Sequence, residues 1–192
     1  MINIDDILSK VPDKRQDKNT TSHKLKIDLF EFFSESKWRD RVILEVACNK
    51  GYSTFLLSHI FKKVLAVELY TDLLDHAKKI NQDRTNIEFI QHDIYQHPWN
   101  FPDVDVIFID ADHRYESVIS DTKNATTLLP NGGYIIYDDY GLPGAGVKHA
   151  VDDLITQNEH FNLIQHIGEG KGSQCRVGKE LIASEGLIIK FG

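Results

Sequence analysis

The stretch RVILEVACNKG, residues 41–51, decides the fold class of this chain. Its first part, Arg41–Ala47, is rich in β-branched and aliphatic side chains and predicts a buried strand. A turn that contains Gly51 follows, and the next apolar segment, Ser53–Phe61, predicts a helix. A second apolar run, Val64–Glu68, predicts another strand. A strand, a short turn, a helix and a strand in this order are typical of a parallel sheet covered by helices.

The same alternation continues along the chain, and its strands are apolar on both faces. Further strands are predicted at Ile87–Asp93, Val104–Asp110 and Tyr134–Asp138. Further helices are predicted at Lys24–Glu35, Asp72–Ile80, Glu116–Leu129 and Val147–Gln157. We therefore expect an α/β fold with a mostly parallel sheet and helices on both of its faces.

The C-terminal tail has a different pattern. Two runs, Phe161–Ile167 and Leu187–Phe191, predict strands, and a Gly-rich stretch at residues 168–172 follows the first of them. No helical pattern lies between the two runs. We expect an antiparallel hairpin at the edge of the sheet.

Size and composition restrict the classes of function. The 192 residues suit one domain, residues 1–192, in which residues 1–22 form an N-terminal arm. The formal net charge of -7 disfavours a nucleic-acid partner, because affinity for phosphate backbones depends on Lys and Arg. No apolar run is long enough to span a bilayer, and the first residues lack the features of a signal peptide. Two cysteines, Cys48 and Cys175, form no disulfide framework. We expect a cytoplasmic protein without a membrane partner.

Acidic residues stand where the predicted strands end. They are Glu45, Glu68, Asp93, Asp110, Asp138 and Asp139. In an open α/β sheet, ligands bind at the carboxyl ends of the strands. A charge beside an apolar core is costly, so a purely structural role seldom demands so many acids there. Their placement indicates a ligand site at that edge of the sheet.

The turn after the first strand carries further signals. Gly51 lets the backbone pass close to a ligand, and Ser53 and Thr54 stand where they can cap the following helix. Asp72 is placed to cap the next helix. The glycines of the dinucleotide fingerprint G-x-G-x-x-G are missing, which disfavours a nucleotide-dependent oxidoreductase.

This turn resembles the first motif of class I S-adenosylmethionine-dependent methyltransferases, an acid followed by G-x-x-x-G, with Ala47 in place of the first glycine. The resemblance implies a Rossmann-like methyltransferase fold with a seven-stranded sheet. It assigns Glu68 to the ribose hydroxyls of the cofactor and Asp93 to the adenine amino group. The full set of cofactor-binding residues that it implies is Glu45, Ala47, Asn49, Gly51, Ser53, Glu68, Leu69, Asp93, Ile94 and Asp110.

The most informative segment is Val106–Glu116. A predicted strand ends in it at Asp110, which is the first residue of the sequence DADHRYE. The next predicted strand ends in Asp138 and Asp139. Carboxylate oxygens suit Mg²⁺, so these two residues and Asp110 are candidate metal ligands. His113 lies just beyond the strand, where it can reach a substrate hydroxyl held on the metal.

The pattern resembles the metal-dependent O-methyltransferases, nearest the macrocin-type sugar O-methyltransferases with their D-x-D-H-x-Y-E signature, and it is similar to catechol O-methyltransferase. The resemblance covers residues 41–155. It implies S-adenosylmethionine and Mg²⁺ as cofactors, with Asp110, Asp138 and Asp139 as metal ligands and His113 as the general base. The expected partner is a small-molecule hydroxyl substrate, a sugar diol or a catechol.

Other functions fit part of the pattern. Asp110 serves only the cofactor in many metal-free methyltransferases, and Asp138 and Asp139 can form a helix-capping turn. A metal-independent N- or C-methyltransferase therefore stays open, as does a non-catalytic partner protein that binds the cofactor. The sequence also leaves open whether the chain is a monomer or a homodimer.

Overall fold

The computed structural model describes residues 3–169, 175–177, 180–182 and 184–192. The strands of its main sheet are β1 (Val42–Val46), β2 (Lys63–Glu68), β3 (Ile87–Gln91), β4 (Val106–Ile109), β5 (Gly133–Tyr137), β6 (Phe161–Ile167) and β9 (Gly186–Phe191). The helices are α1 (Ile4–Leu8), α2 (His23–Phe32), η1 (Ser36–Asp40), α3 (Tyr52–Ile60), α4 (Thr71–Ile80), α5 (Tyr115–Thr127) and α6 (Val147–Gln157), of which η1 is a 3-10 helix.

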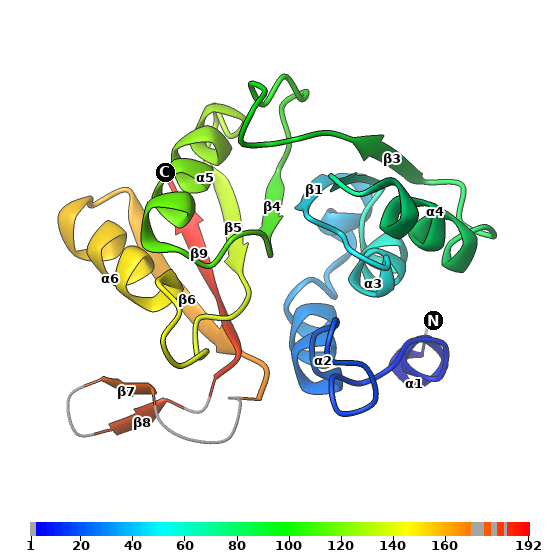
Figure 1. Ribbon diagram of the computed structural model, residues 1–192, viewed down its shortest axis with the longest axis horizontal. Coiled ribbons are helices and arrows are strands. Elements are labelled where there is room, and N and C mark those ends of the chain that lie inside the picture. Colours follow the sequence, from blue (N-terminus) through cyan, green and yellow to red (C-terminus); the bar gives the residue numbers. More distant parts are fainter. Residues whose placement is uncertain (1–2, 170–174, 178–179, 183) are drawn as a thin grey trace.

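The seven strands lie in the order β3-β2-β1-β4-β5-β9-β6 (Figure 1). Strands β1 to β5 run parallel, whereas β9 runs antiparallel to both β5 and β6. This arrangement confirms the predicted α/β fold, including the antiparallel pair at the edge of the sheet.

A separate two-stranded sheet, β7 (Cys175–Val177) and β8 (Glu180–Ile182), was not predicted. Each of these strands has only three residues, too few to show the two-residue period by which a strand is recognised. Of the Gly-rich stretch, residues 170–172 lie outside the described residues.

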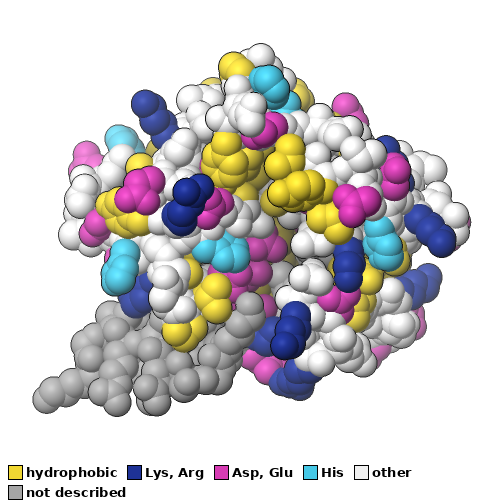
Figure 2. Space-filling view, viewed as in Figure 1, with side chains coloured by type: hydrophobic (Ala, Val, Ile, Leu, Met, Phe, Trp, Pro, Cys, Tyr) yellow, Lys and Arg dark blue, Asp and Glu magenta, His cyan; other side chains and the backbone are white. Residues whose placement is uncertain are grey.

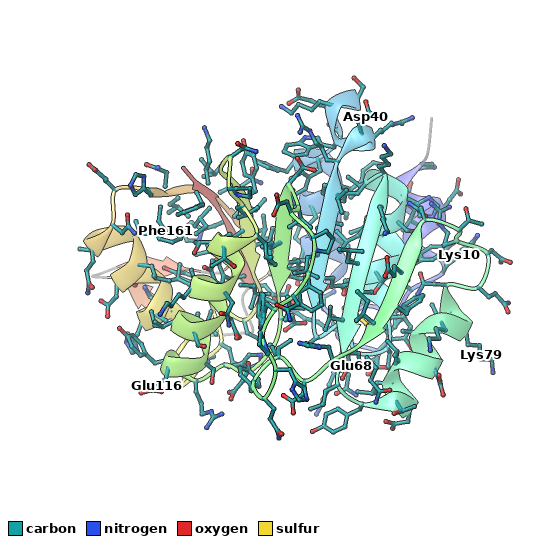
Figure 3. The ribbon with its side chains drawn as sticks, turned by 90° about the horizontal axis from the view of Figure 1, so that it is seen from above. Lys10, Asp40, Glu68, Lys79, Glu116 and Phe161 are labelled. Atoms are coloured by element: carbon teal, nitrogen blue, oxygen red, sulfur yellow. The ribbon has the colours of Figure 1, made fainter. Side chains whose placement is uncertain are left out.

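Two apolar clusters fill the space between the sheet and its helices. On β4, Val106 and Phe108 belong to the cluster that contains residues of α2 and α3, whereas Ile107 and Ile109 belong to the cluster of α5 and α6. Figure 3 shows the strands between two layers of helices. Because both faces are covered, the strands have the near-continuous apolar sequences of a parallel sheet. None of the helices in the described ranges has both the length and the apolar character needed to cross a membrane.

Residues 3–22, which the sequence predicts as an arm, pack against the cluster that contains α2. Ile7 and Val11 are buried in that cluster. The carboxylate of Asp13 accepts the backbone N–H group of His23 at 2.7 Å, which ties the arm to the start of α2.

The predicted helix caps are wrong. α3 begins at Tyr52, so Ser53 and Thr54 lie inside its first turn. α4 begins at Thr71, so Asp72 also lies inside a first turn. Neither helix has a side-chain cap hydrogen bond. An apolar period marks the buried face of a helix and defines its first residue only to within one or two positions.

The hydrogen-bond register aligns the ends of the strands. Val46 of β1 pairs with Val67 of β2 and with Ile109 of β4, and Ile109 pairs with Tyr137 of β5. The residues that follow these four stand side by side at the carboxyl ends of the strands. They are Ala47, Glu68, Asp110 and Asp138.

Gly51 has a left-handed backbone, with a φ of 77°. A Cβ atom at this position would lie 2.7 Å from Ala77 Cβ and 2.8 Å from Asn81 Nδ2. Asn81 Nδ2 also donates a hydrogen bond to the Gly51 carbonyl at 2.9 Å. Gly51 therefore lets the turn after β1 pack closely against α4 and against Asn81, the residue at the C-terminal end of that helix.

Replacement of Gly51 tests this packing. Gly51→Ala combines left-handed strain with a steric clash, so the free energy of unfolding should fall by about 2–4 kcal/mol in a urea titration. Gly144→Ala is the matched control, because Gly144 has a φ of 80° and nothing lies within 4 Å of the added Cβ. The free energy of unfolding of Gly144→Ala should fall by only about 1–2 kcal/mol, because the left-handed backbone is the single cause of strain. Equal losses in the two variants would contradict the packing role.

Candidate functional site

A cavity of about 370 Å³ opens at the carboxyl ends of β1 to β4, and we call it the strand-end cavity. Predicted site residues that line it are Ala47, Asn49, Glu68, Leu69, Asp93, Ile94 and Asp110. Lining residues that the sequence did not indicate are Val67, Tyr70, Leu73, His92, Tyr95, Ala111 and Asp112. Most of the second group adjoin predicted residues in the same strand-end loops, which is the signal that could have found them.

Glu68 holds two of these loops by its carboxylate. Its Oε2 accepts the backbone N–H group of Asn49 at 2.8 Å, and its Oε1 accepts those of Leu69 at 2.8 Å and Tyr70 at 3.0 Å. An ionised carboxylate offers about four lone-pair positions, so about one remains for a ligand. Glu68 was predicted to accept both ribose hydroxyls, but the remaining position leaves room for only one direct hydrogen bond to the ribose.

Asp93 shapes the loop after β3. Its Oδ1 accepts the backbone N–H groups of Tyr95 at 3.0 Å and Gln96 at 3.1 Å. These bonds fold the chain into a turn that carries Ile94 along the wall of the strand-end cavity. The assignment of Asp93 to an adenine amino group stays a prediction.

Backbone strain gathers around the same edge of the sheet. The non-glycine residues with positive φ among those described are Ala47 (63°), Asn49 (50°) and Asp139 (53°). All three follow strand ends at the candidate site. A left-handed backbone costs an L-residue roughly 1–2 kcal/mol, and such strain occurs at binding sites where the surrounding structure enforces it. Ala47 stands in this conformation where glycine would have no such cost.

Three residues expected to bind the cofactor do not line the strand-end cavity. They are Glu45, Gly51 and Ser53. Glu45 is 1% exposed, and its Oε2 accepts the Thr54 hydroxyl at 2.5 Å. Burial raises the pKa of Glu45 to about 8, against the opposing hydrogen bonds from Thr54 and Ser53. Glu45 is therefore largely uncharged at neutral pH, and its hydrogen bond with Thr54 joins β1 to α3.

Three titratable side chains meet beside the strand-end cavity, and we call them the acidic cluster. They are Asp110, His113 and Asp139, whose ligand atoms all lie within 4.8 Å of one another. His113 Nε2 is 3.2 Å from Asp139 Oδ2 and 3.8 Å from Asp110 Oδ1. Figure 2 shows acidic side chains gathered in a hollow at the centre of this face, beside a histidine. The three residues predicted as metal ligands differ from this cluster, because His113 takes the place of Asp138.

Asp138 is buried to about the same degree as Asp139, with 8% of its surface exposed against 7%. Its Oδ1 is buried and has no hydrogen-bond partner within the described part of the chain. Burial raises its pKa well above the ordinary value, and the charges of Asp110, Asp139 and Glu185 raise it further. The metal-ligand role of Asp138 stays a prediction.

A fully buried lysine, Lys26 of α2, balances part of this negative charge. Its Nζ donates to the Thr21 carbonyl at 2.5 Å and to the Thr21 hydroxyl at 2.9 Å. Burial lowers the pKa of Lys26 to about 8, although the nearby carboxylates of Glu185 and Asp138 oppose this shift. The burial of Lys26 was not predicted from the sequence. Its spacing of three from the buried Leu29 places it at the edge of the apolar face and could have indicated burial.

A second depression of about 560 Å³, the outer hollow, adjoins the strand-end cavity. Both include Ala111 and Asp112, and the outer hollow adds His113 and the loop Leu142–Gly146. The Gly146 N–H group donates to the His113 carbonyl at 2.7 Å and holds the two walls together. His113 thus lies where the two spaces meet.

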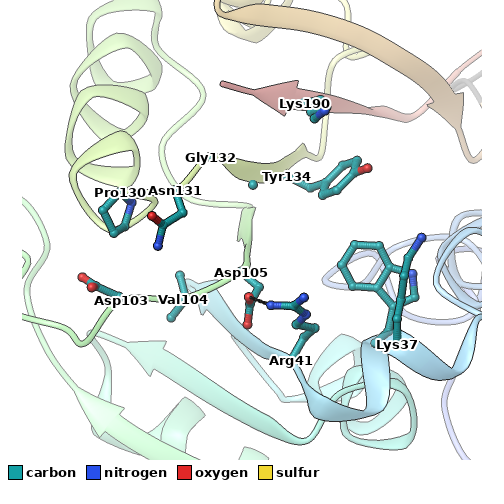
Figure 4. Close-up of a pocket in the computed structure, with 12 residues that line it drawn as sticks. Lys37, Arg41, Asp103, Val104, Asp105, Pro130, Asn131, Gly132, Tyr134 and Lys190 are labelled. Atoms are coloured by element: carbon teal, nitrogen blue, oxygen red, sulfur yellow. Dashed lines mark hydrogen bonds and ion pairs between the residues drawn. The ribbon is translucent and has the colours of Figure 1, made fainter.

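Another depression, of about 510 Å³, lies at the opposite edge of the sheet (Figure 4). Its lining includes Lys37, Arg41, Asp105 and Lys190, and Arg41 is paired with Asp105 at 2.8 Å. It stands at the amino ends of the parallel strands, where α/β folds do not bind their ligands. The strand-end cavity is the smaller space, but it has the titratable cluster beside it.

Comparison with known proteins identifies relatives of the chain. Residues 44–140, about half of its length, match the family described as "Methyltransferase domain". An uncharacterised protein of Acanthamoeba polyphaga mimivirus is 46% identical over 37 residues. This match covers 19% of the chain and only 17% of that viral protein.

Solved structures share the fold over most of the chain. The precorrin 8w decarboxylase of Methanobacterium thermoautotrophicum has a TM-score of 0.65 at 15% identity, with 96% of this chain and 97% of that chain covered. An O-methyltransferase from Bacillus cereus, solved with S-adenosylhomocysteine (SAH), has a TM-score of 0.60 at 18% identity over 97% and 84%. The N-methyltransferase NodS of Bradyrhizobium japonicum has a TM-score of 0.62 at 16% identity over 85% and 92%. At these identities the likeness shows the fold.

The buried carboxyl of Glu45 predicts a pH dependence of stability. Its pKa rises from 4.5 to about 8 on folding, so between these values the unfolded chain has lost a proton that the folded protein keeps. The free energy of unfolding should fall with rising pH in this range, by up to about 1.4 kcal/mol per pH unit. Glu45→Gln should remove this slope and become more stable than the parent near pH 8, measured by urea titration from pH 5 to 8.

Glu31→Gln is the control for this experiment, because Glu31 is an exposed residue of a helix. It should reproduce the slope of the parent protein. Parallel pH profiles for the parent and Glu45→Gln would refute the uncharged state of Glu45.

Proposed function

This chain belongs to the methyltransferase-domain family, and we propose that it transfers the methyl group of S-adenosylmethionine to a hydroxyl oxygen of a small molecule with the help of a divalent cation. The observation that carries the proposal is the acidic cluster, which lies where the strand-end cavity and the outer hollow meet. One space is then available for the cofactor and the other for the acceptor.

The strand-end cavity fits the proposed cofactor in size and chemistry. Its volume of about 370 Å³ is in the ordinary range of small-molecule sites. Glu68 keeps about one free acceptor position for a ribose hydroxyl, and Leu69, Leu73 and Ile94 offer apolar contact to an adenine ring. When bound, S-adenosylmethionine supplies a methyl group activated on a sulfonium. The role of the chain is to orient the methyl group toward the acceptor.

The acidic residues fit a hard divalent cation such as Mg²⁺. Asp110 and Asp139 offer carboxylate oxygens close together, which is the ligand type this ion prefers. We retain Asp138 as a third ligand, because its buried Oδ1 has no hydrogen-bond partner within the described residues and the neighbouring carboxylates repel it. Bound there, the cation would supply positive charge for an acceptor oxygen that loses its proton.

His113 is the proposed general base. Its side chain is 36% exposed and lines the outer hollow, where the acceptor would lie. The carboxylate of Asp139, 3.2 Å from Nε2, orients the imidazole ring. In this role His113 accepts the proton of the acceptor hydroxyl as the oxygen attacks the methyl carbon. A sugar diol or a catechol is the proposed acceptor, since two adjacent hydroxyls suit binding at a cation.

The cofactor assignment predicts the effect of a change at Glu68. Glu68→Gln should weaken SAH binding by about 10- to 100-fold, equivalent to the roughly 1.5–3 kcal/mol of a hydrogen bond to a charged group. Isothermal titration calorimetry measures this affinity. Gln keeps one acceptor oxygen for the three backbone N–H groups, whereas Ala would release both loops.

Glu88→Gln, an exposed change on the neighbouring strand, should bind SAH like the parent protein. Unchanged affinity in Glu68→Gln would refute the ribose assignment. A parent protein that does not bind SAH would refute the cofactor itself.

The metal and the base are tested together. We expect a screen of sugars and catechols to yield an acceptor whose methylation stops with a chelator and resumes with Mg²⁺, and Asp139→Asn should abolish this rescue. His113→Ala should bind Mg²⁺ like the parent in calorimetry but lose about 10²- to 10⁴-fold in rate, the range of general acid–base catalysis. His149→Ala, a change at an exposed histidine of α6, should keep the parent rate.

Two outcomes would correct this proposal. Loss of Mg²⁺ affinity in His113→Ala would make His113 a ligand instead of the base. Full activity in excess chelator would leave a metal-independent methyltransferase.

A further inference from the structure

A buried carboxyl group lies behind the wall of the strand-end cavity. Asp121 of α5 is 0% exposed, and its Oδ2 accepts the Tyr95 hydroxyl at 3.0 Å. Its Oδ1 is buried and has no hydrogen-bond partner among the described residues. Burial of a carboxyl with one unpartnered oxygen costs stability, and an apolar side chain on this helix would avoid that cost. Asp121 therefore does not serve stability, and we look for its role in its hydrogen bond with Tyr95.

Tyr95 joins two strand-end loops through its hydroxyl. The residue follows β3, lines the strand-end cavity and is 48% exposed. Its oxygen accepts the backbone N–H group of Asp112 at 3.1 Å, while its hydrogen is donated to Asp121. A hydroxyl whose hydrogen is fixed by a carboxyl presents its lone pairs in a fixed direction, here toward the Asp112 N–H group.

Asp112 is held from a second side by the start of α5. Its Oδ1 accepts the Arg114 backbone N–H group at 3.1 Å, and its Oδ2 accepts the Ser117 hydroxyl at 3.0 Å. Asp112 stands in the chain between Asp110 and His113. Its position therefore sets where the loop carries two members of the acidic cluster.

We propose that Asp121 is a positioning residue, which acts through the Tyr95 hydroxyl to hold residues 110–113 against the strand-end cavity. The inference rests on the proposed function, because it takes the strand-end cavity to be the cofactor site. Asp121 touches neither space directly. Its effect reaches the cavity through the wall that Tyr95, Ala111 and Asp112 form.

The protonation of the two groups agrees with this arrangement. Burial raises the pKa of Tyr95, so its phenol stays a donor at neutral pH. Burial also raises the pKa of Asp121 to about 7, although the hydrogen bond from Tyr95 opposes the shift. In both of its protonation states Asp121 keeps an oxygen that can accept from Tyr95.

Hydrogen exchange of the ligand-free protein tests the link between the loops. Tyr95→Phe removes the hydroxyl and keeps the ring, and Asp121→Ala removes its acceptor. Both should speed amide exchange in peptides that cover residues 93–97 and 110–114 by about tenfold, the worth of one or two hydrogen bonds. Asp121→Asn keeps an acceptor oxygen and should exchange like the parent.

Tyr137→Phe is the matched control. The Tyr137 hydroxyl of β5 is hydrogen bonded at 2.7 Å to Thr122, which lies on α5 as Asp121 does. Tyr137 is fully buried and lines neither the strand-end cavity nor the outer hollow. This variant loses a tyrosine hydrogen bond to α5 and should unfold at a lower temperature. Its exchange at residues 110–114 and its affinity for SAH should equal those of the parent.

SAH titration then connects the link to the cavity. Tyr95→Phe and Asp121→Ala should each weaken SAH binding by about tenfold, and the double variant should lose no more than either single one. A residue with only a structural role would lower the melting temperature and leave affinity unchanged.

Each outcome has a definite meaning. Unchanged exchange in Asp121→Ala, or faster exchange with parental SAH affinity, would overturn the inference. Lack of SAH binding by the parent would instead count against the proposed function, and the exchange measurement, which needs no ligand, would still decide whether Asp121 holds residues 110–113.

Discussion

The structure depends on the common level at which its parallel strands end. Val46, Val67, Ile109 and Tyr137 are aligned by the hydrogen-bond register of β1, β2, β4 and β5. Helices cover both faces of these strands, so the strands themselves admit almost no polar side chains. The first positions free for polar chemistry are the residues just beyond the register. The chain places Glu68, Asp110 and Asp138 there, and the alignment brings together residues that lie far apart in sequence.

Such a gathering of acids is costly, and each one is stabilised in a different way. The carboxylate of Glu68 accepts three backbone N–H groups. Glu45 and Asp138 are buried, and burial raises the pKa of each. The buried ammonium group of Lys26 in α2 interacts with the charges of these carboxyl groups, Asp138 and Asp110 among them. Asp139 is also buried, whereas Asp110 lines the strand-end cavity, and a cation from solution would offset the repulsion between these two carboxylates.

The walls of the site are held by contacts among loops and helices beyond the sheet. The Glu68 carboxylate joins the loops after β1 and β2, and the Tyr95 hydroxyl joins the loops after β3 and β4. Left-handed backbone at Ala47, Asn49 and Asp139 occurs in the same region. Strain of this kind persists only where surrounding contacts enforce it, so the loops are shaped before any ligand arrives.

The sequence by itself determined the strands of the main sheet and the helices α2 to α6 along the chain, with Glu68, Asp110 and Asp138 at the strand ends. The helix Val147–Gln157 and the strand Phe161–Ile167 agree with the structure to the residue, because apolar periodicity is a local property. Only the tertiary structure decided that His113 meets Asp139, that Gly51 packs on α4, and that Tyr95 meets Asp121. Each of these contacts joins separate segments of the chain. Their geometry follows from how the helices and loops pack on the sheet, which no local pattern of residues specifies.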